Sequence, residues 1–116
     1  MFFTSLLISA CLLYTVPQIK TASDEIDAVV YGYSSTIDQT DLSPFRTASG
    51  QMVRDGIAAN NCLPFGVKVV INDRIYEVQD RMSSRYNCNV FDIWFSDRQT
   101  AIEFGKQRLK IRIIKR

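Results

Sequence analysis

Two aspartates border a polar loop in the second half of the chain, and their positions suggest acid–base chemistry. Asp80 follows the alternating residues 75–79, and Asp92 lies within the apolar run 90–95. Alternation with a period of two predicts a strand that leads into the loop, and the apolar run predicts a second strand that leaves it. A carboxylate in an apolar, aromatic strand is costly unless it is hydrogen-bonded or charge-paired. Asp92 therefore has a specific partner or a chemical role.

We expect the two strand ends to bring these carboxyl groups into reach of each other or of a shared hydrogen-bond network. Two close carboxylates do not both ionise easily, so one pKa should be raised. We assign the role of acid to Asp80. The structural alternative for Asp80 is a salt bridge to Arg81 or Arg85. The alternative for Asp92 is a buried carboxylate that accepts backbone N–H bonds.

The composition excludes several classes of site. The chain has 116 residues, which is enough for one core but not for two ordinary domains. It contains no histidine, so the commonest catalytic base and the commonest metal ligand are missing. The net charge is only +2, and the basic residues after position 105 alternate with apolar ones, which indicates the solvated face of a strand. Attraction to an anionic polymer is the second interpretation. We predict no metal, no cofactor and no nucleic-acid partner.

Residues 1–23 are predicted to be a signal peptide or an N-terminal membrane anchor. Residues 2–16 are almost wholly apolar, a length typical of a signal peptide and short of the roughly 20 residues that span a membrane. No Lys or Arg precedes this run, and residues 8–11 (ISAC) have the spacing of a lipoprotein cleavage site. A cleaved signal peptide, an uncleaved anchor and a lipoprotein would each place residues 24–116 in the cell envelope or outside the cell. The membrane is then contacted only through this segment, and we expect a monomer.

Cysteine usage agrees with export. Of the three cysteines, Cys11 lies in the predicted signal segment, which leaves Cys62 and Cys88 as an even pair in an exported domain. Both lie in predicted loops beside the two strands, so we predict a disulfide between them. Two free buried thiols are the alternative. Two cysteines without histidine do not make a zinc site.

The remaining patterns predict a mainly β domain. Apolar and β-branched segments separated by Gly, Asn and Pro turns predict six strands, and residues 72–73 predict a hairpin turn. Ser96 with Gln99 forms a capping box for a short helix over residues 96–104, and Gly105 ends it. The result is a small closed β-barrel with one helix. The expected strands cover residues 26–33, 57–59, 67–71, 75–80, 90–95 and 109–114.

Six short motifs occur in the order found in the three-aspartate (3D) domain family, and residues 26–114 resemble that family. The resemblance implies a six-stranded double-psi β-barrel, related to the catalytic domain of membrane-bound lytic transglycosylase A and to rare lipoprotein A. It also implies action on the glycan strand of peptidoglycan. The motifs are TASG at 47–50, DGIAAN at 55–60, LPFG at 63–66, VQDRM at 78–82, DIWF at 92–95 and AIEFG at 101–105.

The chemistry of a lytic transglycosylase suits a chain without histidine. This enzyme cleaves the bond between N-acetylmuramic acid and N-acetylglucosamine, and the sugar's own hydroxyl closes an anhydro ring. One carboxyl group can act first as acid and then as base, whereas ordinary glycosidases need two carboxylates at a set separation. By resemblance, the second and third family aspartates fall on Asp80 and Asp92. Residues 59–61 (Ala-Asn-Asn) replace the first.

The resemblance and the residue types together give a set of expected site residues. Asp80 is the expected general acid and base, with Asp92 as its catalytic neighbour. A glycan-binding barrel without catalysis is one alternative function, favoured by the missing first aspartate. A structural or partner-binding module of the envelope is the other, favoured by the small size of the chain. The expected substrate-binding residues are Tyr33, Thr47, Asn60, Asn61 and Arg81.

Overall fold

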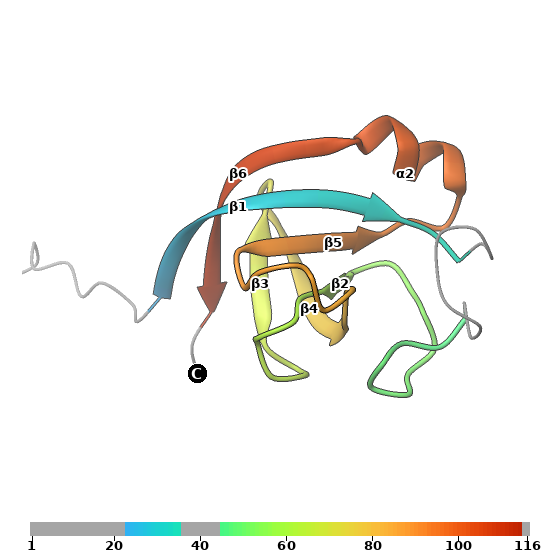
Figure 1. Ribbon diagram of the computed structural model, residues 1–116, viewed down its shortest axis with the longest axis horizontal. Coiled ribbons are helices and arrows are strands. Elements are labelled where there is room, and N and C mark those ends of the chain that lie inside the picture. Colours follow the sequence, from blue (N-terminus) through green and yellow to red (C-terminus); the bar gives the residue numbers. More distant parts are fainter. Residues whose placement is uncertain (1–22, 36–44, 115–116) are drawn as a thin grey trace, which may run out of the picture.

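The computed structural model describes residues 23–35 and 45–114 (Figure 1). Residues 1–22 of the predicted signal or anchor segment and residues 36–44 lie outside this described part. Within the described part of the chain, no helix is long and apolar enough to cross a membrane. The elements are β1 (Ser23–Tyr33), β2 (Ile57–Ala59), β3 (Lys68–Ile71), β4 (Arg74–Asp80), β5 (Val90–Trp94), α2 (Arg98–Phe104) and β6 (Lys106–Ile114).

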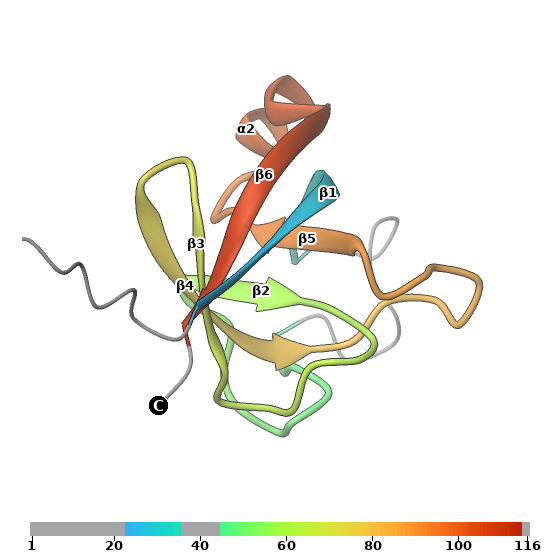
Figure 2. The same ribbon diagram turned by 90° about the vertical axis from the view of Figure 1, so that its left-hand side faces the viewer.

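The six strands form a closed barrel in the order β1-β5-β2-β4-β3-β6. The pairs β1–β5 and β2–β4 are parallel, and the other four pairs are antiparallel. Figures 1 and 2 show β1 and β6 crossing one side of the barrel together, with α2 at one end of them. The mainly β fold class, a closed six-stranded barrel with one short helix, is confirmed. Its mixture of parallel and antiparallel neighbours is compatible with the double-psi topology.

Alternate residues of the strands face inward and form the core. Val30, Val78, Phe91, Ile93 and Ile111 are almost fully buried and belong to one apolar cluster. In β5, Phe91 and Ile93 point into this cluster, so Asp92 between them points to the outer face of the barrel. Burial of each such side chain stabilises the fold by about 1.5–3 kcal/mol. The outer face is therefore the surface on which a site can be built.

The short helix packs against β1 through a glycine. A Cβ atom at Gly32 would lie 2.8 Å from the Phe95 ring and 2.9 Å from the carbonyl oxygen of Ala101, so only glycine allows this approach. The helix N-cap is Asp97, not the predicted Ser96. Its side chain accepts hydrogen bonds from the backbone N–H of Thr100 at 2.8 Å and from the Thr100 hydroxyl at 2.6 Å. A carboxylate one residue later than the serine thus makes the capping contacts.

Two boundaries depend on backbone conformation and pairing. Asn72 and Asp73 have φ values of 52° and 62°, the two positive values that a tight hairpin between β3 and β4 requires. Strand β6 begins at Lys106, directly after the helix C-cap Gly105, and not at the predicted residue 109. The reason is that β6 pairs with β1 as far as Tyr31, opposite Lys106. Its polar first residues belong to the outer face.

Candidate functional site

Five residues from five strands form a continuous line of register partners across the outer face of the barrel. Lys106 pairs with Tyr31, Tyr31 with Asp92, Asp92 with Ala59, and Ala59 with Asp80. Directly paired residues share one face of a sheet, and neighbouring strands lie about 4.8 Å apart. We call this line the cross-strand row. The row brings the two aspartates of the sequence prediction to either side of the small Ala59.

Asp80 accepts three hydrogen bonds. The Tyr33 hydroxyl donates to Oδ2 at 2.8 Å, and the backbone N–H groups of Ala48 and Arg81 donate to Oδ1 at 2.8 and 2.9 Å. The three donors therefore occupy both oxygens of the Asp80 side chain. Burial and the adjacent Asp80 charge raise the pKa of Tyr33, so its phenol keeps the proton that it donates. Tyr33 therefore contacts Asp80 directly, and its role in substrate binding stays a prediction.

Asp92 has the opposite environment. It is half-buried, and its Oδ1 atom is buried without any hydrogen-bond partner in the described part of the chain. Burial, followed by the negative charge of Asp80, raises the pKa of Asp92 from 3.8 to about 7. Burying an oxygen without a hydrogen-bond donor costs less free energy for a neutral carboxyl group than for an ionised one. Asp92 thus carries a proton over part of the neutral pH range.

The raised pKa thus falls on Asp92, whereas we expected the acid to be Asp80. The physical reason is the turn at residues 47–50, which delivers the Ala48 N–H to Asp80 and leaves Asp92 without a donor. We had considered that Asp92 accepts hydrogen bonds from backbone N–H groups. The carboxylate that accepts such bonds is instead Asp80. No long-range contact of this kind is visible in the linear sequence, although the TASG motif marks the turn that makes it.

The alternative considered for Asp80, a salt bridge to Arg81 or Arg85, does not form among the described residues. The Arg81 guanidinium donates to the carbonyl oxygens of Asn60 at 2.9 Å and Asp80 at 3.4 Å. It also lies 3.9 Å from the centroid of the Phe65 ring. Arg85 instead donates to the Tyr86 hydroxyl at 2.9 Å. Arg81 therefore borders the site, and its guanidinium binds backbone carbonyl groups instead of the Asp80 carboxylate. That carboxylate accepts its hydrogen bonds from the Tyr33 hydroxyl and from two backbone N–H groups.

Asn60 is not a substrate-binding residue, because it is fully buried and both ends of its amide are occupied. Its Nδ2 donates to the carbonyl oxygens of Cys88 and Val90, each at 2.9 Å. Its Oδ1 accepts from the backbone N–H groups of Cys62 and Leu63, each at 2.9 Å. Asn60 joins two loops beside the site, and this corrects our expectation that it lies on the rim as a free polar group.

Asn61 has a similar structural role. Its amide donates to the carbonyl oxygens of Ser83 at 2.8 Å and Tyr86 at 3.3 Å, and its Oδ1 accepts from the backbone N–H of Met82 at 2.7 Å. These bonds hold the loop between β4 and β5 in place and occupy the groups that we expected to bind substrate. Asn61 is half-buried, and its role in substrate binding stays a prediction.

The same loop is held by a disulfide. Cys62 and Cys88 are bonded, with their Cα atoms 5.3 Å apart, a distance within the usual range for a disulfide. The bond lies beside the Asn60 hydrogen bonds to Cys88, so covalent and polar contacts tie the same two loops. Both loops border the cross-strand row.

Thr47 shapes the site without facing it. It is buried, and its hydroxyl contacts the Ser49 hydroxyl at 2.9 Å and accepts from the Gln51 N–H at 3.2 Å. These bonds form the turn that presents the Ala48 N–H to Asp80. Thr47 is thus a turn-forming residue, and its expected direct contact with substrate is not supported.

Sequence reasoning missed an aromatic pair at the other end of the cross-strand row. The Tyr31 and Tyr86 rings lie with centroids 6.0 Å apart and tilted by 56°. The alternation of β1 places Tyr31 on the same face as Tyr33, which is a signal that the sequence contained. Tyr86 comes from the loop between β4 and β5, so its approach to Tyr31 required the fold.

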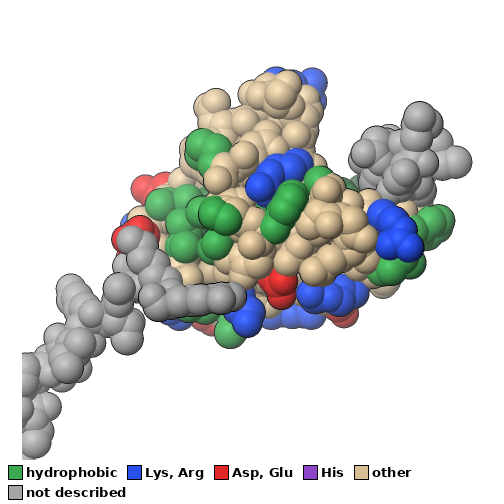
Figure 3. All heavy atoms as spheres, turned by 90° about the horizontal axis from the view of Figure 1, so that it is seen from below, with side chains coloured by type: hydrophobic (Ala, Val, Ile, Leu, Met, Phe, Trp, Pro, Cys, Tyr) green, Lys and Arg blue, Asp and Glu red, His purple; other side chains and the backbone are tan. Residues whose placement is uncertain are grey.

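The surface around the site is mixed in character. Figure 3 shows hydrophobic side chains beside Lys and Arg side chains on one face of the molecule. Phe45, Met52 and Phe65 are exposed at 61%, 55% and 42%. Phe65 is covered on one side by Arg81. Single exposed hydrophobic residues are normal on protein surfaces, so these three residues define no site by themselves.

Comparisons with known proteins add no family assignment, since no protein-family model and no curated protein matches the chain. Within the described residues, no group of three or more His, Cys, Asp or Glu side chains is arranged to hold a metal ion. The chemistry of the site therefore has to be argued from its two aspartates, its tyrosines and the donors around them.

Proposed function

We propose that this domain cleaves the glycan strand of peptidoglycan in the manner of a lytic transglycosylase, with Asp92 as the general acid and base. One observation carries the proposal. A carboxyl group with a pKa of about 7 lies in the same cross-strand row as a second carboxylate that has three hydrogen-bond donors. Environments that separate two carboxyl groups in this way are typical of acid–base sites.

The reaction requires one proton to leave Asp92 and one to return to it. Protonated Asp92 gives its proton to the glycosidic oxygen as the bond from that oxygen to the anomeric carbon breaks. Positive charge develops on the anomeric carbon, and the fixed carboxylate of Asp80 stabilises it electrostatically. The sugar's own hydroxyl then bonds to the anomeric carbon and returns its proton to Asp92. No water and no protein nucleophile enter the balance.

The resemblance to the three-aspartate family supports the same chemistry with a reduced set of groups. Residues 59–61 lie where the first family aspartate is expected, and the Asn60 side chain among them is hydrogen-bonded to backbone at both ends. Only Asp80 and Asp92 of the family set remain as carboxylates. A reaction that needs one acid–base group is therefore the glycosidic chemistry that this site suits best.

The test is incubation of the oxidised protein with purified peptidoglycan, followed by mass spectrometry of the soluble products. Anhydro-muropeptides are expected from the wild type. Asp92→Asn should lower their rate of formation by at least about 10²-fold, because the amide cannot carry the proton. Asp55→Asn is the matched control, since Asp55 is exposed and forms a surface ion pair with Arg74. Absence of anhydro products from the wild type would reject the proposal.

A glycan-binding barrel without catalysis is the second candidate. It is favoured by Asn60, which replaces a family carboxylate with a buried structural amide. In that case the protein would sediment with insoluble peptidoglycan, and no anhydro products would appear. If neither binding nor cleavage occurs, a structural role in the envelope takes the place of both.

A further inference from the structure

Two exposed cations of β6 lie near the site without an acidic partner. Lys106 and Arg108 are the register partners of Tyr31 and Val29 of β1. Neither cation forms an ion pair within the described part of the chain. We call Lys106 and Arg108 the unpaired cations. The next two cations along β6 stand opposite acidic residues, Lys110 opposite Asp27 and Arg112 opposite Glu25.

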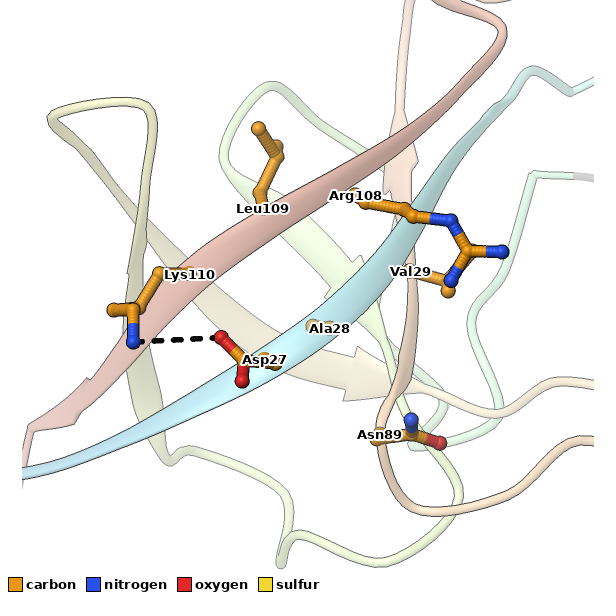
Figure 4. A pocket seen from close by; sticks show the side chains of 7 residues that line it. All are labelled: Asp27, Ala28, Val29, Asn89, Arg108, Leu109 and Lys110. Carbon is orange, nitrogen blue, oxygen red and sulfur yellow. Dashed lines mark ion pairs between the residues drawn. The ribbon is translucent and has the colours of Figure 1, made fainter.

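This division of charge lies along a hollow of about 470 Å³ (Figure 4). Lys110 turns to Asp27, with its Nζ 3.4 Å from Oδ1, and both residues line the hollow. Arg108 extends across β1 near Val29, and Asn89 completes this side of the lining. The Asp27–Lys110 ion pair contributes no net charge, so the positive charge of the hollow comes from Arg108.

The unpaired cations lie close to the proposed acid. Tyr31 is the register partner of both Asp92 and Lys106, so two strand spacings, roughly 10 Å, separate the backbones of those two residues. The Lys106 ammonium group is directed over the strand between them, since its Nζ lies 5.9 Å from the centroid of the Tyr31 ring. Arg108 lies two residues further along β6, which adds roughly 7 Å along the strand.

The carboxylates of the site do not cancel this positive charge. Four strand spacings, roughly 19 Å along the cross-strand row, separate Asp80 from Lys106. This separation exceeds the Debye length of about 8 Å at physiological ionic strength. Asp92 is neutral while it carries the proton that it donates. An anionic group that arrives near Lys106 therefore meets net positive charge.

The proposed reaction determines which part of the substrate arrives there. Formation of the anhydro ring requires N-acetylmuramic acid beside Asp92, and the lactyl group of this sugar is amide-linked to the stem peptide of peptidoglycan. The lactyl group is therefore uncharged, and the free carboxylates belong to the peptide. The first of them is the α-carboxylate of the second peptide residue, a glutamate that continues the chain through its side chain. The lactyl group and two residues span roughly 10 Å when extended, which matches the separation between Asp92 and Lys106.

We infer that Lys106 and Arg108 bind this α-carboxylate, and that the domain selects glycan whose stem peptides carry it free over glycan in which it is amidated. The inference rests on the proposed function, because that function places N-acetylmuramic acid at Asp92. Guanidinium and ammonium groups bind carboxylates by charge-assisted hydrogen bonds, which a neutral amide cannot form in the same way. The hollow beside Arg108 falls within the range of about 300–1,000 Å³ that is usual for ligand sites, and the Asn89 amide can both donate to and accept from a peptide group.

The test compares two soluble tetrasaccharides by calorimetry. Both alternate N-acetylglucosamine and N-acetylmuramic acid, and every lactyl group carries an alanyl-glutamate dipeptide whose side-chain carboxyl is capped as an amide. The α-carboxyl of the glutamate is free in one ligand and amidated in the other. The protein carries Asp92→Asn, so that neither ligand is consumed. We expect the free acid to bind about tenfold more tightly than the amide, and the difference to shrink in high salt.

Two double variants with the same change in net charge decide whether the unpaired cations are responsible. Lys106→Gln with Arg108→Gln should bring the two affinities to about the same value. Lys68→Gln with Arg112→Gln should preserve the preference, because both side chains are exposed and neither lines the hollow. Equal binding of the two ligands, no binding of either, or an equal loss of preference in the second double variant would each overturn the inference.

Incubating the wild type with the same two ligands separates this inference from the proposed function. Faster formation of anhydro products from the free acid supports both. Cleavage of the two ligands at equal rates would overturn the inference and leave the proposed function intact. Preferential binding of the free acid without any cleavage would support the peptide subsite and reject the proposed reaction.

Discussion

At the scale of residues, the site depends on how differently the fold treats two aspartates. Asp80 has three donors, and Asp92 has a buried oxygen with none among the described residues. Both were identifiable from the sequence as unusual carboxylates beside apolar strands. Their roles were not, because the decisive donor on Asp80 comes from Ala48, which is 32 residues away in the chain. Contacts of that range are properties of the fold.

The first residue-scale prediction concerns pH and Asp92. The pKa of Asp92 is about 7 in the folded protein instead of 3.8, so the folded state holds a proton that the unfolded chain releases between about pH 4 and pH 7. Stability from this group is therefore greatest at low pH and falls as the pH rises through that window. This difference in pKa corresponds to at most about 4 kcal/mol in the free energy of unfolding.

Asp92→Asn should remove this dependence. Its free energy of unfolding, measured in urea, should equal or exceed that of the wild type at pH 8, and the advantage should vanish by about pH 4. Asp55→Asn, at an exposed position, should show the pH dependence of the wild type. If wild type and Asp92→Asn lose stability equally between these pH values, Asp92 does not carry the proton.

The second residue-scale prediction concerns the Tyr33 hydroxyl. Tyr33→Phe removes a donor to the Asp80 carboxylate while it leaves the ring in place. Hydrogen bonds to charged groups contribute about 1.5–3 kcal/mol, so we expect a loss of stability of that order in urea unfolding. Tyr76→Phe is the matched control, because Tyr76 is also buried and its ring contacts Arg74. A Tyr33→Phe variant as stable as this control would show that the hydrogen bond contributes little.

At the scale of elements, strands were predictable because burial on one face imposes a period of two. Residues 57–59 agree fully with β2, and the hairpin turn at residues 72–73 agrees with the backbone. The early start of β6 was missed, because its first residues are polar on the outer face and are held by pairing with β1. The alternation of apolar residues identifies the strand faces that pack against the core. It does not identify pairing between strands whose exposed residues are charged.

The helix start provides the element-scale prediction. Asp97 accepts two hydrogen bonds from Thr100, and these bonds lower the pKa of Asp97. Asp97→Ala should therefore reduce the melting temperature at neutral pH, whereas Ser96→Ala should leave it nearly unchanged. Since the pKa is lowered, the effect of Asp97→Ala should fade as the pH falls through the folded-state pKa. A larger effect of Ser96→Ala at neutral pH would restore Ser96 as the cap.

At the scale of the whole molecule, barrel closure assembles the site from segments far apart in the chain. Tyr33 from the end of β1 reaches Asp80 at the end of β4, and Ala48 of the turn at residues 47–50 donates to the same carboxylate. The cross-strand row adds β2, β5 and β6. Closure also leaves no free sheet edge among the six strands, so the outer face can serve binding without inviting strand pairing.

The disulfide is the covalent contribution to this assembly and gives the last prediction. Cys62 and Cys88 are separated by 26 residues, and closing a loop of that size stabilises a fold by about 3.5 kcal/mol in the chain-entropy estimate. The double variant Cys62→Ala, Cys88→Ala should lose about that amount in urea unfolding, and reductant should destabilise the wild type but not the variant. Because Asn60 bonds the carbonyl of Cys88 independently, the variant should keep its fold, and its near-ultraviolet circular dichroism should change little. Equal stability of the wild type with and without reductant, once full reduction is verified by thiol titration, would show that Asn60 and the loop hydrogen bonds suffice to hold the two loops together.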